Sequence, residues 1–326
     1  MKARSYILFA ATALMLAACS NDGLPGDDPN APVEIRLTGG LEVQTRTSHN
    51  LDTQLKAGEQ VHVWVDDAGV ADKELYKDKE LRAEENRSLT GETMYFPQTG
   101  NAVDIYAIHG NFGEATDWSE GGFWATEITH TVAQNQKTQQ PTDGYAKSDL
   151  VYAKSTGIAR TKNTVPLTFS HLLSKIEVVL VQGAGSPEIA KMEILSTKLE
   201  AFFTPSKENE FEVTANGTDG KNPIEIDIDL TDAKTAANTA SDEGKELNEA
   251  IIVPQELTQG TAFIRVTTAE GGELIYRLPE SKTFDPAKKY RFTVTANLTE
   301  LKVVSAKITD WTKEIGDDDG TAEMEE

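Results

Sequence analysis

Apolar and polar residues alternate with a period of two along most of the chain. In "VEIRL", Val33, Ile35 and Leu37 alternate with Glu34 and Arg36. The same pattern recurs in "VHVWV", "VDIYAI", "IEVVLV", "IEIDIDL", "AFIRVTT", "ELIYRL" and "YRFTVTANL". Successive side chains of a strand point to opposite faces, so this period predicts half-buried strands. "AEGGE" lies between two of these runs and predicts a hairpin turn.

Helical periodicity is rare. Two highly charged segments, residues 73–86 and 241–250, are candidates for short helices. The polar segment 157–167 interrupts the strand pattern, and strong strand signals stand on both sides of it. We therefore predict an all-β protein of two sandwich domains, residues 33–165 and 166–326.

The N-terminus has the composition of an export signal. Lys2 and Arg4 precede an uncharged run, residues 5–18, that is short for a membrane span. "LAAC", residues 16–19, resembles the lipobox of bacterial lipoproteins. That resemblance implies that residues 1–18 are removed and that Cys19 carries acyl chains, palmitate among them, that anchor it to a membrane. The alternative is a plain secretory signal that leaves Cys19 as a free thiol.

The residue after the cysteine is Ser20, where some inner-membrane lipoproteins carry a retaining aspartate. We therefore expect an outer-membrane location. Residues 19–32 are rich in Gly, Pro, Asp and Asn, which is typical of a flexible tether.

The chain is strongly acidic. Its formal charge is −22, and loss of Lys2 and Arg4 with residues 1–18 makes it −22 − 2 = −24. Nucleic-acid binding needs a basic footprint, so we expect no nucleic-acid partner. Cys19 is the only cysteine, so disulfides cannot stabilise the fold.

No catalytic, cofactor or metal motif is apparent. The histidines, residues 49, 62, 109, 130 and 171, are scattered, and His171 is expected to be a core or turn residue. Glu225, Asp227 and Asp229 share one strand face, which is either solvated or, less favoured, a cation site. "DWSEGGFW", residues 117–124, either packs on a core, which we favour, or stacks on a sugar. We therefore predict a protein that is not an enzyme and binds no cofactor or metal.

Several segments in order resemble the fimbrillin family of Bacteroidetes, the FimA/Mfa-like pilus-subunit lipoproteins. They are "VEIRLTGGLEVQTRTS", "LKAGEQVHVWV", "MYFPQTGNAVDIYAIHG", "DLVYAKSTG", "VPLTFSHLLSKIEVVL", "IIVPQ" and "VSAKITDW". The resemblance implies two tandem transthyretin-like Greek-key β-sandwich domains. It also implies a fimbrial subunit that serves adhesion, reaches the outer membrane and cell surface as a lipoprotein, and is cut there by an arginine-specific protease.

In that family, loss of the first strand opens a groove that a strand of another pilin subunit fills by donor-strand exchange. Here the removable segment would be 33–46, with Val33, Ile35 and Leu37 as the apolar face of the plug. Arg46, followed by Thr47, is the candidate cleavage point, and Arg36 is a less suitable one because it lies inside the strand.

The position of this subunit in a pilus is left open by the sequence. The end of the chain, residues 314–326, carries seven acidic residues, which suit a disordered tail better than a donated strand. Stalk, tip and anchor roles all stay open. A second hypothesis is a surface lipoprotein that binds glycan or host protein and never polymerises, and a surface hydrolase is a remote third.

Overall fold

The computed structural model describes most of the chain from Ala31 onward. The described residues are 31–41, 55–113, 118, 122–137, 144–182, 185, 188–208, 211–216, 220–226, 248–297, 301–310 and 321–322. Residues from Val33 onward form one compact unit. Among the described residues, no helix has both the length and the apolar character needed to cross a membrane.

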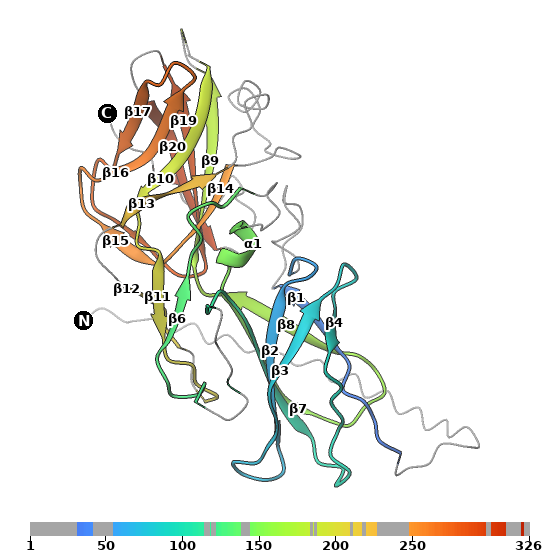
Figure 1. Cartoon of the computed structure of the whole chain (residues 1–326). Coiled ribbons are helices and arrows are strands. Elements are labelled where there is room, and N and C mark those ends of the chain that lie inside the picture. Colours follow the sequence, from blue (N-terminus) through green and yellow to red (C-terminus); the bar gives the residue numbers. More distant parts are fainter. Residues whose placement is uncertain are drawn as a thin grey trace, which may run out of the picture. The chain divides into compact units, whose positions relative to one another are not determined.

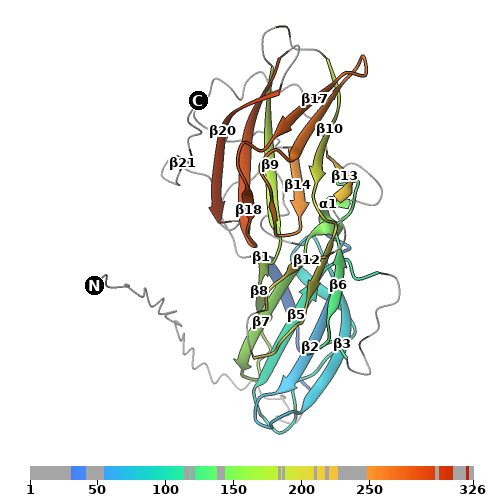
Figure 2. The ribbon, with the colours of Figure 1, turned by 90° about the vertical axis from the view of Figure 1, so that its left-hand side faces the viewer.

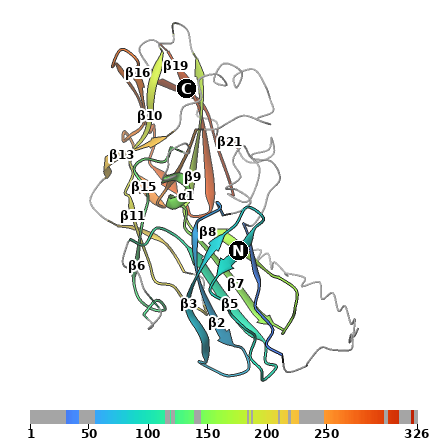
Figure 3. The ribbon, with the colours of Figure 1, turned by 45° about the vertical axis from the view of Figure 1, so that its right-hand side comes forward.

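Seven strands close into a barrel (Figure 1). In spatial order they are β1 (Leu37–Leu41), β4 (Ser88–Gly91), β3 (Glu74–Ala83), β2 (Gln60–Asp67), β5 (Val103–His109), β7 (Val151–Ile158) and β8 (Val165–His171). All neighbours run antiparallel except β1 and β8, which pair in parallel and close the barrel. Figure 3 shows β2, β3 and β5 side by side.

The rest of the described chain forms four further sheets (Figure 2). The largest orders β14 (Asn248–Ile252), β9 (Ser174–Gln182), β19 (Lys288–Ala296), β20 (Leu301–Asp310) and β21 (Thr321–Ala322). A second orders β13 (Gly220–Ile226), β10 (Ile189–Ser196), β16 (Ala262–Thr268) and β17 (Glu273–Arg277). The smaller ones are β12 (Thr214–Asn216), β11 (Glu200–Phe203) and β6 (Ile128–Thr131), and the pair β15 (Gln255–Leu257) and β18 (Lys282–Phe284). A single described helix, α1, spans Gly144–Ser148.

Two apolar clusters hold these sheets together. One fills the barrel and includes Leu37, Val63 and Phe169. The other is larger and joins the outer face of β2 and β5 to the strands of the second half of the chain, with Trp64 among its members. Strand β2 is therefore buried on both faces, whereas alternation in "VHVWV" predicted one polar face.

The all-β prediction is confirmed, and the turn at "AEGGE" joins β16 to β17 as an antiparallel hairpin. Gly271 adopts a φ of 86° in that turn, a conformation that favours glycine. The helix predicted at residues 73–86 is wrong, because this segment forms β3 between β2 and β4. Its charged residues pair with neighbouring elements, as Lys79 does with Glu92 at 2.5 Å.

The helix predicted at residues 241–250 lies mostly outside the described residues, and its end, from Asn248, belongs to β14. Strand β8 shares the barrel with β1 and β7 as far as His171. The division near residue 165 and the two tandem Greek-key sandwiches stay predictions.

Candidate functional site

The first described segment, residues 33–41, lies between two neighbours that are distant in sequence. On one side it pairs antiparallel with β4, where Leu37 faces Leu89. On the other it pairs in parallel with β8, from Leu37 beside Val165 to Leu41 beside Phe169. Upstream of β1, Glu34 forms an antiparallel bridge with Tyr95. The segment thus has partners on both of its edges.

Alternate side chains of this segment enter the barrel core. Ile35, Leu37 and Leu41 are 4%, 2% and 2% exposed, and Val33 is half-buried against the same cluster. Glu34 and Arg36 between them are exposed. The period of two predicted for Val33, Ile35 and Leu37 is therefore confirmed, and it continues through Gly39 and Leu41, which the sequence analysis did not single out.

Backbone hydrogen bonds fix the register of the segment. The Ile35 amide donates to the Met94 carbonyl at 2.8 Å, and the Gly39 amide donates to the Arg87 carbonyl at 2.9 Å. On the other edge the Val165 amide donates to the Arg36 carbonyl at 2.8 Å. Removal of the segment would break these backbone hydrogen bonds with the rest of the barrel.

The charged residue within the strand is also held in place, since the Arg36 guanidinium donates to the Lys162 carbonyl. The other N-terminal candidates, Cys19, Arg46 and Thr47, lie outside the described residues, as do Asp227, Asp229 and the acidic residues 314–320 and 323–326.

A second candidate site is a polar pocket of about 540 Å³ beside β2 and β5. Its walls include Glu59, Glu80, Arg82, Asn111, Lys147 and the ring of Phe112. Two acids and two bases therefore line it, although the whole chain carries 53 acidic and 31 basic residues. The sequence analysis missed this pocket because its residues come from separate strands and from α1.

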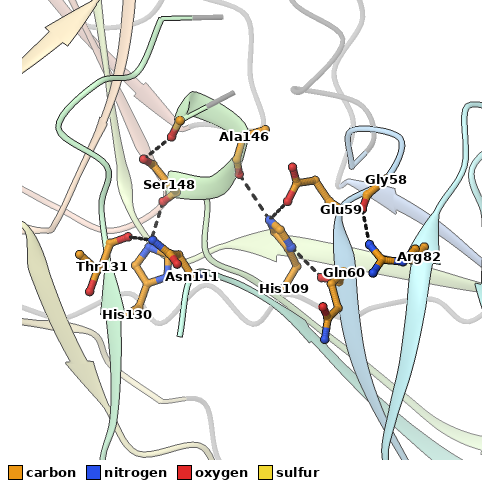
Figure 4. A network of polar contacts seen from close by, with 11 residues as sticks. Gly58, Glu59, Gln60, Arg82, His109, Asn111, His130, Thr131, Ala146 and Ser148 are labelled. Atoms are coloured by element: carbon orange, nitrogen blue, oxygen red, sulfur yellow. Dashed lines mark hydrogen bonds and ion pairs between the residues drawn. The ribbon is translucent and has the colours of Figure 1, made fainter. Parts of the chain in front are cut away.

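Buried histidines tie α1 to the strands behind this pocket (Figure 4). His109 contacts the Gln60 carbonyl through Nδ1 at 2.8 Å and the Ala146 carbonyl through Nε2 at 3.4 Å. His130 accepts from the Asn111 amide at Nδ1 and donates from Nε2 to the Ser148 carbonyl at 3.0 Å. Burial lowers the pKa of His130 to about 4, against the opposing effect of the Ser148 carbonyl.

A buried ionic network joins β9, β14 and β19. The Lys175 ammonium lies 2.9 Å from a Glu249 oxygen and 3.6 Å from a Glu177 oxygen, and all three side chains are almost completely buried. Arg291 donates to the other Glu177 oxygen at 2.8 Å, and the Tyr145 hydroxyl donates to Glu249 at 2.8 Å. Paired charges of this kind are compatible with burial.

The remaining sequence candidates occupy packed positions. His171 is a core residue, 3% exposed, with Nδ1 3.0 Å from Asp149, as expected. In "DWSEGGFW", Trp118 and Phe123 are buried. Phe123 stacks on Trp64 and the Trp118 ring packs against it at a tilt, which confirms the packed interpretation for the described part of this loop. Glu225 pairs with Lys137 and Lys191, and the described residues contain no cluster suited to a metal.

A model of fimbrillin-like proteins matches residues 45–311. The chain belongs to the fimbrillin-like family. This family comprises fimbrial structural subunits and is not an enzyme class. The matched range begins just after β1 and ends before the acidic tail. A comparison with curated proteins finds no match.

Two solved structures of Bacteroides proteins show the same fold as this fimbrillin-like chain. A candidate cell adhesion protein from Bacteroides uniformis has a TM-score of 0.60 and 21% identity, with 87% of this chain and 100% of that one covered. A second, from Bacteroides ovatus, has a TM-score of 0.59 and 17% identity over 87% and 99% of the two chains. The tip fimbrial protein Mfa3 from Porphyromonas gingivalis, truncated at its C-terminus, has a TM-score of 0.48 and 11% identity, with 86% of this chain and 100% of that one covered.

Proposed function

We propose that this fimbrillin-like protein is a fimbrial adhesion subunit whose first strand is removed and replaced by a strand of another subunit. The observation that carries the proposal is the position of residues 33–41. They fill the barrel core with alternate side chains and pair with β4 and β8 on opposite edges. This strand can be separated by a single cut, because β1 is the first described strand and every other described strand follows it in the sequence.

Removal of the strand is costly enough to drive replacement. Full burial of a Leu or Ile side chain stabilises a fold by about 1.5–3 kcal/mol, and three such side chains, Ile35, Leu37 and Leu41, would leave the core. The exposed edges of β4 and β8 would also lack hydrogen-bond partners. A strand from a second subunit restores both the burial and the backbone bonds.

The same geometry favours filaments. A strand of one subunit that enters the barrel of the next makes a heterologous contact, and such contacts propagate when they do not close into a ring. Cleavage after Arg46 by an arginine-specific protease would release the strand together with a lipid at Cys19. A subunit that stays uncut would instead remain anchored to the outer membrane.

The test is cleavage of the purified chain lacking residues 1–18 with a trace of arginine-specific protease. We expect a new N-terminus at Thr47 and a ladder of multimers on a denaturing gel run without boiling. The Arg46→Gln variant should give neither, while Arg36→Lys should behave as the parent chain. A chain that is cut at Arg46 and stays monomeric contradicts the proposal for a polymerising subunit.

The polar pocket favours one alternative, a surface protein that binds glycan. Its volume falls within the range of small-molecule sites, and Arg82, Glu59 and Asn111 supply donors and acceptors beside the ring of Phe112. Saturation-transfer NMR with galactose, fucose, N-acetylglucosamine and sialic acid tests it. Binding that is lost in Arg82→Gln and kept in Lys191→Gln, a residue outside the pocket, would support this function. Absence of transfer from all four sugars would count against it.

A further inference from the structure

Gly39 is the buried position of β1 that has no side chain. It follows Ile35 and Leu37 on the inward face of the first segment and precedes Leu41. A Cβ built on Gly39 would lie 3.1 Å from Cε2 of Phe169 and 3.3 Å from Cδ2 of Leu89. The core therefore has space for Leu or Ile side chains at three inward positions and for almost nothing at this one.

The glycine is there for space and not for backbone conformation. Gly39 is absent from the residues with positive φ, so any residue could adopt its backbone geometry. Phe169, which closes the space, is fully buried on β8, and Leu89 on β4 is 7% exposed. Any residue larger than glycine would require these two side chains to shift, and inserting extra carbons into a packed core is generally destabilising.

The neighbouring glycine provides the contrast. A Cβ built on Gly40 meets no atom within 4 Å, and this residue is only half-buried. The two adjacent glycines thus lie on opposite faces of the same strand, and only the inward one, Gly39, is confined by Phe169 and Leu89. The pair allows the effect of this space to be separated from any general effect of glycine in a strand.

We propose that the groove left by β1 selects its incoming strand by admitting only a small residue at the place of Gly39. This inference rests on the proposed strand exchange and adds a rule for the partner. The fitting strand takes the place of β1 beside β8, has a mainly apolar inward face, and carries glycine or another small residue at the place of Gly39. Continuous alternation of Val, Ile or Leu, the commonest pattern of a half-buried strand, is rejected at Phe169.

Competition between labelled peptides tests the rule. The chain is cut after residue 46 with an arginine-specific protease, or with a sequence-specific protease whose site replaces residues 44–50. Excess labelled peptide with the sequence of residues 33–41 is present during the cut, and the label retained with the body of the protein is measured after gel filtration. Three peptides are compared: the parent sequence, Gly39→Val and Gly40→Val. The two variants have the same composition and the same gain in strand propensity.

We expect the parent and Gly40→Val peptides to be retained alike, and Gly39→Val to be retained at least about tenfold less, since overpacking of a core commonly weakens an interaction by this factor or more. Equal retention of the two variants would show that the groove does not select for residue size at the place of Gly39. Strand exchange itself would not be contradicted. If the first segment leaves the protein but the parent peptide is not retained, the result contradicts strand exchange, and with it the proposed selection at Gly39.

Discussion

Leu37 of β1 lies beside Val165 of β8 in a parallel pairing, while its other edge faces Leu89 of β4. Residues from the start of the described chain thus close a barrel whose other strands are all antiparallel neighbours. A parallel pair needs a long connection between its strands, and here the whole of the barrel supplies it. The first strand consequently makes all its strand pairings with residues that are distant in the sequence.

Truncation of Leu37 should destabilise the protein strongly. Leu37 is 2% exposed in the barrel core, and replacing a buried Leu with Ala generally lowers the free energy of unfolding by about 2–5 kcal/mol. Urea denaturation of Leu37→Ala measures the loss. Glu34→Ala, an exposed change in the same segment, should alter the free energy of unfolding by less than about 0.5 kcal/mol. Equal losses in the two variants would mean that the segment is not seated in the core.

Stability should fall as the pH drops from 6.5 towards 4. Burial lowers the pKa of His130 to about 4 in the folded protein, from an ordinary value of 6.5. Over this window the unfolded chain binds a proton at His130 and the folded chain does not, so protonation favours unfolding. Between pH 7.5 and pH 4.5 the free energy of unfolding should decrease by about 2 kcal/mol from this group alone.

Urea titrations of the parent chain and of His130→Asn at several pH values check this. The imidazole is surrounded by His109, Asp149, the Asn111 amide, the Phe112 ring and the Ser148 carbonyl, and all of them remain in the variant. The variant should be less stable than the parent chain at pH 7.5. Its free energy of unfolding should decrease by about 2 kcal/mol less than that of the parent chain when the pH is lowered to 4.5. If its pH dependence equals that of the parent chain, the titration of His130 is not the cause.

Loss of the Lys175 charge should cost more than loss of an exposed lysine. Lys175→Met leaves Glu177 and Glu249 buried without this partner, and removing one member of a buried ion pair costs about 3–5 kcal/mol. Lys191, whose side chain is 38% exposed beside Glu193, serves as the control, and Lys191→Met should cost less than about 1 kcal/mol. Thermal and urea unfolding of both variants distinguish them. Similar small losses would show that the buried network adds little stability.

Adding Glu249→Gln to Lys175→Met should recover part of the loss, because the second change removes one of the two buried carboxylates that lose the lysine. A double-mutant cycle over Lys175 and Glu249 then measures their coupling. A double variant that is as unstable as the sum of its parts would contradict direct pairing of these two residues.

The sequence was sufficient for the strands but not for their environment. Alternation in "VEIRL" correctly placed Ile35 and Leu37 inward, because one face of this strand meets the core and the other meets solvent. The same alternation misassigned His62 and Trp64 to a polar face. Both are buried, since a second apolar cluster covers the outside of β2, and His62 is satisfied by Asp78 at 2.5 Å.

Features that depend on contacts between residues distant in the sequence could not be predicted from the local alternation of apolar and polar residues. The charged segment 73–86 is a strand because it pairs with β2 and β4, and its local sequence does not show those partners. Ion pairs to distant residues, such as Lys79 with Glu92, are likewise not visible in the local pattern. The confinement of Gly39 by Phe169 became visible only with the parallel pairing of β1 and β8. The polar pocket is likewise lined by Glu59, Arg82 and Lys147, which are far apart in the sequence, so no local spacing of residues predicts it.

The most direct measurement is native mass spectrometry of the multimers that form after cleavage at Arg46. The fragment that contains residues 33–46 has a known mass, so each species reveals how many fragments it retains. Strand exchange predicts that each monomer keeps its fragment. Each strand inserted between two subunits displaces one fragment, so a dimer should hold a single fragment. Multimers that retain one fragment per subunit would contradict the account, because their subunits would be joined without vacating the place of β1.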